Sequence, residues 1–326
     1  MAALGANLGI AATKFAAFAI TGSASLLAES AHSVADSGNQ ILLLLGRKRA
    51  LREETEEHQF GFGGERYFYA FIVAVVLFTV GALFSVYEGV QRIGHPEQVT
   101  SPYVAFGVLF IAIVLEGFSL RTAIGESRPA RGSASWRSFV RFIRRSKAPE
   151  LPAVVLEDTA AITGLVFALV GVSLTEATRD SRWDGAGSIA IGVLLACVAT
   201  ILAVEMKSLL IGESASPDVE AEIVGAIQDG PGAPRVIHLR TLHVGPDTLL
   251  VAAKIAVAGH DPAARVVAAI DAAERRIRAA VPIAEHIFLE PDLYRAARLD
   301  LTDPAVRAAR RSSLLARSRR ALRTRR

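Results

Sequence analysis

A run of residues near the start of this 326-residue chain carries side chains that could bind a metal ion. Within an otherwise apolar stretch stand Glu29, His32 and Asp36, followed by Asn39 and Gln40. Counted from Glu29 the offsets are 3, 7, 10 and 11, so a helix would place all five on one face. An imidazole and a carboxylate four residues apart can point at one ion from successive turns. The spacing therefore predicts a metal-binding face.

A second apolar stretch contains the neighbouring acids Glu157 and Asp158 and no other charge between residues 151 and 174. Histidine and carboxylate donors suit zinc, manganese, ferrous iron or cobalt. The one cysteine, Cys197, lies in an apolar run and reads as a buried hydrophobe, so a thiolate site for copper(I) is disfavoured. Such ligands lose protons when metal binds, which links metal binding to pH.

Stepping along the chain, six stretches are long and apolar enough to cross a bilayer as helices, which takes roughly 20 residues. They are Leu4–Ile20, Ser25–Leu45, Tyr67–Val90, Tyr103–Leu120, Leu151–Leu174 and Gly185–Val204. The composition, 52% hydrophobic and 21% charged, excludes a disordered chain, collagen and a disulfide scaffold. We predict an all-α, six-helix membrane bundle over residues 1–212. Because ionisable groups inside spans are costly, those in the second and fifth spans are functional candidates.

The distribution of cations predicts the orientation of the bundle. The connection between the second and third spans holds five Lys or Arg and residues 121–150 hold eight, whereas residues 21–24 and 94–102 hold none. Cation-rich loops stay on the cytoplasmic side, so both termini are expected there, in a multi-pass protein of the plasma (inner) membrane. The net charge of +4 then reflects membrane topology, and no nucleic-acid partner is expected.

This topology tests whether the two acidic stretches can meet. Asp36 lies ten residues from the inner end of its span at Gly46, and Asp158 lies eight from Glu150. At about 1.5 Å per residue the two carboxylates differ in depth by only a few ångströms. A site at this depth that exchanges a divalent cation for protons would be the centre of an antiporter. The alternative is that these groups form interhelical hydrogen bonds that only hold the bundle together.

The sixth span begins with residues that have simpler interpretations. Asp184 is a candidate for the ion path or, more simply, an N-cap at the membrane edge. Gly185, Gly187 and Gly192 permit close approach of a neighbouring helix, which is a packing role.

The pattern changes after Met206. Residues 213–293 predict a helix, two strands joined by a turn at residues 245–247, a second helix and a third strand. This order is typical of a small α+β domain with helices on one face of the sheet. The Arg-rich tail, residues 294–326, is expected to be disordered or helical.

Four motifs resemble the cation diffusion facilitator family, and its zinc transporter nine-like branch in particular. They are S-A-S-L-L-A-E-S-A-H-S-V-A-D-S (Ser23–Ser37), H-Q-F-G-F-G-G-E-R-Y-F (His58–Phe68), D-T-A-A-I-T-G (Asp158–Gly164) and W-D-G-A-G-S-I-A-I-G (Trp183–Gly192). The resemblance implies a dimeric, six-helix, proton-coupled exporter of divalent metal with a ferredoxin-like cytoplasmic domain.

The resemblance also implies a ligand set for the transported metal. His32 and Asp36 match the two ligands of the second span, and Asp158 matches the acidic ligand of the fifth. Four residues before Asp158, where family members with a tetrahedral site have His or Asp, this chain has Val154. Water, Glu157 or Asn39 would then supply the fourth ligand.

We therefore expect a secondary transporter that exports zinc by proton-coupled alternating access, with no resident cofactor. Its partners would be the transported metal ion, protons, the lipid bilayer and a second copy of the chain. The alternatives are an exporter of manganese, iron or cobalt with an octahedral site, and a membrane metal sensor that does not transport. An intramembrane hydrolase is a weaker alternative, because no separate group that would polarise a substrate is evident.

Overall fold

The computed structural model of the chain describes residues 2–96, 101–131, 138, 142–143, 146–230 and 233–293, except for the side chains of residues 2–7 and 128–131. The chain divides into two compact units, Met1–Ile211 and Gly212–Arg326. The tail predicted for residues 294–326 lies outside the described residues.

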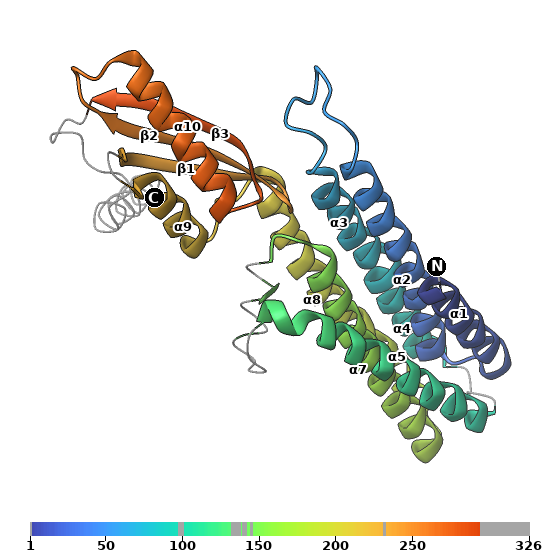
Figure 1. Cartoon of the computed structure of the whole chain (residues 1–326). Helices are drawn as coiled ribbons and strands as arrows, with labels where there is room; N and C mark the ends of the chain where they lie inside the picture. The colour runs from blue at the N-terminus through green and yellow to red at the C-terminus, as the bar shows by residue number, and fades with distance from the viewer. Residues whose placement is uncertain are drawn as a thin grey trace, which may run out of the picture. The chain divides into compact units, whose positions relative to one another are not determined.

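The first unit is built from long helices (Figure 1). They are α1 (Ala2–Thr21), α2 (Ala24–Ala50), α3 (Glu65–Val76), α4 (Phe84–Gly94), α5 (Pro102–Arg131), α7 (Glu150–Thr178) and α8 (Arg182–Ile211), with a π-helical segment, η1 (Leu77–Leu83), between α3 and α4. Each of the six predicted apolar stretches lies within one of these helices, the third within the continuous run α3–η1–α4.

Four helical stretches are long and apolar enough to cross a membrane. They are Glu65–Gly94, Pro102–Ser127, Glu150–Thr178 and Arg182–Ile211. The described apolar part of α1, Leu8–Thr21, is shorter, and α2 is interrupted by ionisable side chains. Four of the six predicted spans are thereby confirmed as candidates, and the crossing of the membrane by α1 and α2 stays a prediction.

Glycines allow α4 and α8 to touch through their backbones. A Cβ at Gly89 would lie 2.5 Å from the carbonyl oxygen of Gly185, and one at Gly192 would lie 2.8 Å from that of Ala82. Real Cβ atoms do not approach backbone so closely, so only glycine fits at these crossings. The packing role predicted for Gly185 and Gly192 is confirmed, because small residues are what let membrane helices approach.

Asp184 fastens the beginning of α2 to the beginning of α8. Its buried carboxylate accepts hydrogen bonds from Ser23 Oγ at 2.7 Å, from the Ala24 N–H at 2.5 Å and from the Ser25 N–H at 3.3 Å. The first N–H groups of a helix have no partner within it, and a carboxylate there also complements the helix dipole. Asp184 was predicted to be an N-cap. It is one, but for α2 and not for its own helix.

The π-helical segment interrupts the third apolar stretch. Hydrogen bonds from residue i to i+5 are rare in helices and occur often at functional sites. The segment packs on α8, where a Cβ at Gly81 would lie 3.1 Å from Leu195 Cδ1. The apolar periodicity of Tyr67–Val90 predicts one regular helix and contains no signal for this change.

The second unit contains a three-stranded sheet and two helices (Figure 1). Its elements are α9 (Pro217–Gln228), β1 (Arg235–Gly245), β2 (Thr248–Val257), α10 (Ala263–Ala280) and β3 (Ala284–Leu293). The strand order is β1-β2-β3, with β1 and β2 antiparallel and β2 and β3 parallel. Alternate residues of β2, such as Val251 and Ile255, are buried in one core with Ile223 of α9 and Ile277 of α10. The predicted α-β-β-α-β order is confirmed.

Candidate functional site

One face of α2 carries polar side chains into the interior of the first unit. Glu29 and Asn39 are fully buried, and His32 is 1% exposed. The helix begins at an N-cap, Ser23, whose hydroxyl accepts a hydrogen bond from the Leu26 N–H. Helices α1, α7 and α8 all pack against α2, so its polar face meets neighbouring helices and not solvent.

His32 and Asp36 form a pair on successive turns of α2. His32 Nδ1 lies 3.4 Å from Asp36 Oδ1. Both ring nitrogens of His32 and Oδ1 of Asp36 are buried and have no hydrogen-bond partner among the described residues. Buried polar atoms are nearly always hydrogen-bonded, so three such atoms in one pair call for a ligand. The donor types and the absence of competing bonds suit a divalent metal ion.

Asn39 and Glu157 join α2 to α7. Asn39 Nδ2 donates a hydrogen bond of 2.8 Å to Glu157 Oε1, and the glutamate is 5% exposed. The other amide atom, Asn39 Oδ1, is buried without a partner in the described part of the chain. The two residues that were weighed as supplementary ligands therefore lie together, and Glu157 is the acid of α7 that faces α2.

Asp158 is directed toward a different helix. It accepts a hydrogen bond of 2.9 Å from Ser119 Oγ on α5 and is partly exposed. Within the residues that the structure describes, no three His, Cys, Asp or Glu side chains are grouped closely enough to hold a metal ion. The structure thus brings together His32 with Asp36 and Asn39 with Glu157, and it leaves Asp158 with Ser119.

A buried lysine completes the polar interior, and sequence reasoning did not assign it a role. Lys14 of α1 is 1% exposed, and its Nζ lies 3.1 Å from Glu29 Oε2 and 2.8 Å from Ser33 Oγ. The signal available in the sequence was a single cation inside the first apolar stretch. Its partner could not be identified from spacing, because the two residues lie on different helices.

An ion pair lies where α3 and α7 begin. Arg66 donates from Nε to Glu150 Oε1 at 2.5 Å and from an Nη atom to Glu150 Oε2 at 2.9 Å. Two parallel bonds between a guanidinium and a carboxylate fix geometry more firmly than a single bond. This pair ties the first turns of two helices that flank the polar interior.

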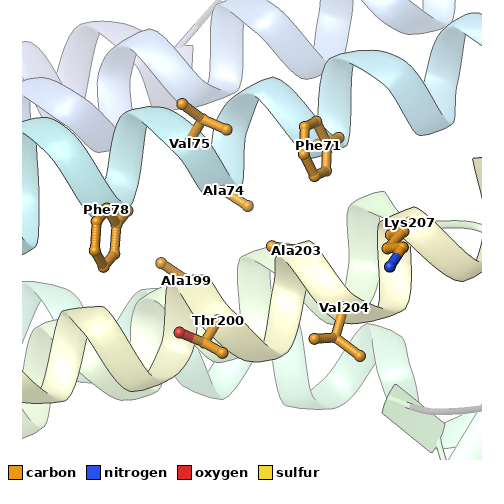
Figure 2. A pocket seen from close by; sticks show the side chains of 9 residues that line it. All are labelled: Phe71, Ala74, Val75, Phe78, Ala199, Thr200, Ala203, Val204 and Lys207. Atoms are coloured by element: carbon orange, nitrogen blue, oxygen red, sulfur yellow. The ribbon is translucent and has the colours of Figure 1, made fainter.

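An apolar groove lies apart from these ionisable residues, between α3, η1 and α8 (Figure 2). It is lined by Phe71, Ala74, Val75, Phe78, Ala199, Thr200, Ala203, Val204 and Lys207. Lys207 is the only charged residue of this lining, and none of the polar residues of α2 or α7 contributes to it. The groove has no chemistry for a cation, so the buried polar face of α2 is the candidate site.

Helices with a buried His–Asp pair, set in an apolar bundle, define a membrane protein of the metal-transporting class. Residues 1–211 match the Cation efflux transmembrane domain family. The chain belongs to this cation efflux family, the cation diffusion facilitators, which confirms the family resemblance of its motifs.

Several curated relatives are similar to the chain. The proton-coupled zinc antiporter SLC30A9, mitochondrial, of Homo sapiens is 34% identical over 225 residues, which are 69% of this chain and 39% of that protein. Metal tolerance protein C4 of Arabidopsis thaliana is 28% identical over 254 residues, 78% of this chain and 55% of the relative. The cation-efflux pump FieF of Shigella flexneri is 25% identical over 237 residues, 72% of each chain. The chain thus spans about two fifths of the length of the zinc antiporter, and these names describe transporters and not enzymes.

Proposed function

We propose that the chain is a secondary transporter that exports a divalent metal cation, zinc first, in exchange for protons by alternating access. The observation that carries this proposal is the His32–Asp36 pair, whose buried ring nitrogens and carboxylate oxygen have no hydrogen-bond partner among the described residues. Ionisable groups inside membrane helices are costly and mark ion pathways. The names of the relatives, a zinc antiporter and a cation-efflux pump, support the same function.

The proposed metal ligands are His32 and Asp36, completed from α7 by Asp158. The geometry supports an exchange of acids during the cycle, because Glu157 is bonded to Asn39 of α2 while Asp158 is bonded to α5. Successive residues of a helix are about 100° apart around its axis. A rotation of α7 by that amount would turn Asp158 toward His32 and Asp36, and Glu157 away from α2. We propose that this rotation accompanies metal binding.

The proposed coupling to protons follows from the chemistry of the donors. Carboxylate and imidazole ligands must be free of protons to bind metal, so a bound ion and bound protons exclude each other. When the ion leaves, buried carboxylates without a counter-charge are costly, and protons replace the lost positive charge. Metal and protons would therefore cross in opposite directions.

Val154 is the basis for a second candidate substrate. With an apolar residue in place of a fourth ligand, the donors comprise one imidazole and several oxygens, from Asp36, Asp158, Glu157 and Asn39. Oxygen-rich sites suit manganese and other ions that take six ligands. Flux of zinc measured against competing manganese, ferrous iron and cobalt separates the two candidates.

The remaining architecture is carried over from the sequence and the family. We propose six membrane-crossing helices over residues 1–212, a ferredoxin-like domain over residues 213–293 on the cytoplasmic side, and a homodimer. The plasma (inner) membrane is the proposed location. The relatives named as mitochondrial make an organelle membrane the alternative, and localisation of the tagged full chain decides between them.

Proteoliposomes that contain a zinc-sensitive dye test the proposed function. The purified chain should move zinc in a way that depends on an imposed proton gradient, and His32→Ala or Asp158→Ala should reduce this flux to background without loss of the folded protein. His260→Ala is the matched control, because this histidine is exposed in the second unit. Wild-type flux in both site variants would refute the ligand assignment. Metal binding without any flux would favour the sensor.

A further inference from the structure

Lys14, Glu29 and Ser33 form a polar cluster that the transport site described above does not use. The Lys14 ammonium donates to Glu29 Oε2 at 3.1 Å and to Ser33 Oγ at 2.8 Å. The three side chains are 1%, 0% and 3% exposed. A buried ion pair is weak support for stability, because desolvation of both charges offsets their attraction. Its presence inside the bundle therefore calls for a role other than holding α1 to α2.

One oxygen of this cluster is available to a ligand. Glu29 Oε1 is fully buried and has no hydrogen-bond partner among the described residues. It points at Gly164 of α7, where a Cβ would overlap it, so α7 presents no side chain at this level. The carboxylate is thus satisfied by Lys14 on one oxygen and open on the other.

The position of the cluster connects it to the His32–Asp36 pair. Glu29 precedes His32 by three residues and Ser33 follows it by one, so the cluster lies about one helical turn, roughly 5 Å, from the imidazole on the same face of α2. It lies toward the start of α2, whereas Asp36 lies toward the end. In the proposed orientation the start of α2 is on the side where the exported ion leaves.

We propose that Glu29 and Ser33 form a second, transient site for the divalent cation, which Lys14 occupies as a tethered cation while the transporter holds no ion. The arriving ion displaces the ammonium from the Glu29 carboxylate, and the return of Lys14 drives the ion outward. Lys14 thereby keeps the exit site from retaining metal. This inference rests on the proposed transport function and adds a step to it.

Zinc binding and zinc flux of the full-length chain in lipid membranes test the proposal together. Lys14→Met removes the tethered cation and leaves Glu29 as an additional anionic donor. Its dissociation constant for zinc should fall by about tenfold, the order expected when one like charge near a divalent ion is removed. Its maximal flux should fall as well, because the ion is no longer displaced. Thr13→Ala, on an exposed face of α1, is the matched control and should match wild type in both measurements.

A charge-balanced variant separates this role from a structural one. Lys14→Met with Glu29→Gln removes both charges together, so the dissociation constant should return to within about threefold of wild type while flux stays low. If Lys14 only held α1 to α2, the single variant would lower the yield of folded protein without changing the dissociation constant of the folded fraction. That result, or wild-type flux in the double variant, overturns the inference.

The two proposals fail in different ways. If wild-type protein shows no zinc flux, the proposed function fails and the exit site fails with it. If wild-type protein transports zinc and His32→Ala abolishes this flux, but Lys14→Met keeps the wild-type dissociation constant and flux, only the exit site is refuted.

Discussion

The Asp184→Ala substitution tests whether α2 depends on a cap that comes from another helix. In the structure this carboxylate accepts hydrogen bonds of 2.7 Å from Ser23 Oγ and 2.5 Å from the Ala24 N–H, together with a longer one from the Ser25 N–H. Truncation removes all three acceptors at a place that is fully buried. Water cannot replace them there, so the donors remain unsatisfied.

The magnitude follows from the two shorter bonds. A hydrogen bond to a charged group contributes about 1.5–3 kcal/mol, so the loss of both costs about 3–5 kcal/mol. For a unit of this size, that corresponds to a decrease in Tm on the order of 10 °C. Asp184→Asn should lie between wild type and alanine, because the amide keeps one acceptor oxygen.

Thermal unfolding of the detergent-solubilised chain, followed by tryptophan fluorescence, measures this decrease. Asp180→Ala is the matched control, since Asp180 is exposed and accepts one local hydrogen bond from the Arg182 N–H. Loss of that local contact should cost about 1 kcal/mol or less. Equal Tm values for Asp184→Ala and wild type would refute the capping argument.

Two further predictions concern helix contacts within the first unit. Gly89→Ala should lower the Tm by several degrees, because its Cβ would lie 2.5 Å from the Gly185 carbonyl oxygen; Gly94→Ala, which meets nothing within 4 Å, is the control in the same thermal scan. Asn39→Ala removes the hydrogen bond to Glu157 and leaves that carboxylate without its partner on α2. We expect a severalfold decrease in zinc flux at an unchanged yield of folded protein, and unaltered proteoliposome flux would contradict the link between α2 and α7.

The helices and the α+β unit followed from local patterns. Runs of apolar residues near 20 in number predict helices in membranes, and the turn at residues 245–247 separated two strand patterns that the sheet confirms. The depth argument correctly indicated that the acids of α7 lie near the polar face of α2. It could not decide which of two adjacent acids faces α2, because that depends on the rotation of α7, and the structure has Glu157 there.

Features that depend on packing between helices were beyond local patterns. The Lys14–Glu29 pair joins residues whose proximity follows from how α1 lies on α2. The cap from Asp184 crosses 160 residues of sequence to Ala24. A residue type and its burial could be anticipated in each case, but the partner could not.

The π-helical segment Leu77–Leu83 has a consequence for how the third apolar stretch tolerates insertions and deletions. A π turn accommodates one residue more than an α turn, and one residue corresponds to about 100° of rotation around a helix axis. Loss of a single residue there would leave a regular helix of nearly the same length. It would also rotate everything that follows, including Gly89, away from its contact with Gly185. The length of this segment, counted in residues, therefore sets which side of α4 meets α8.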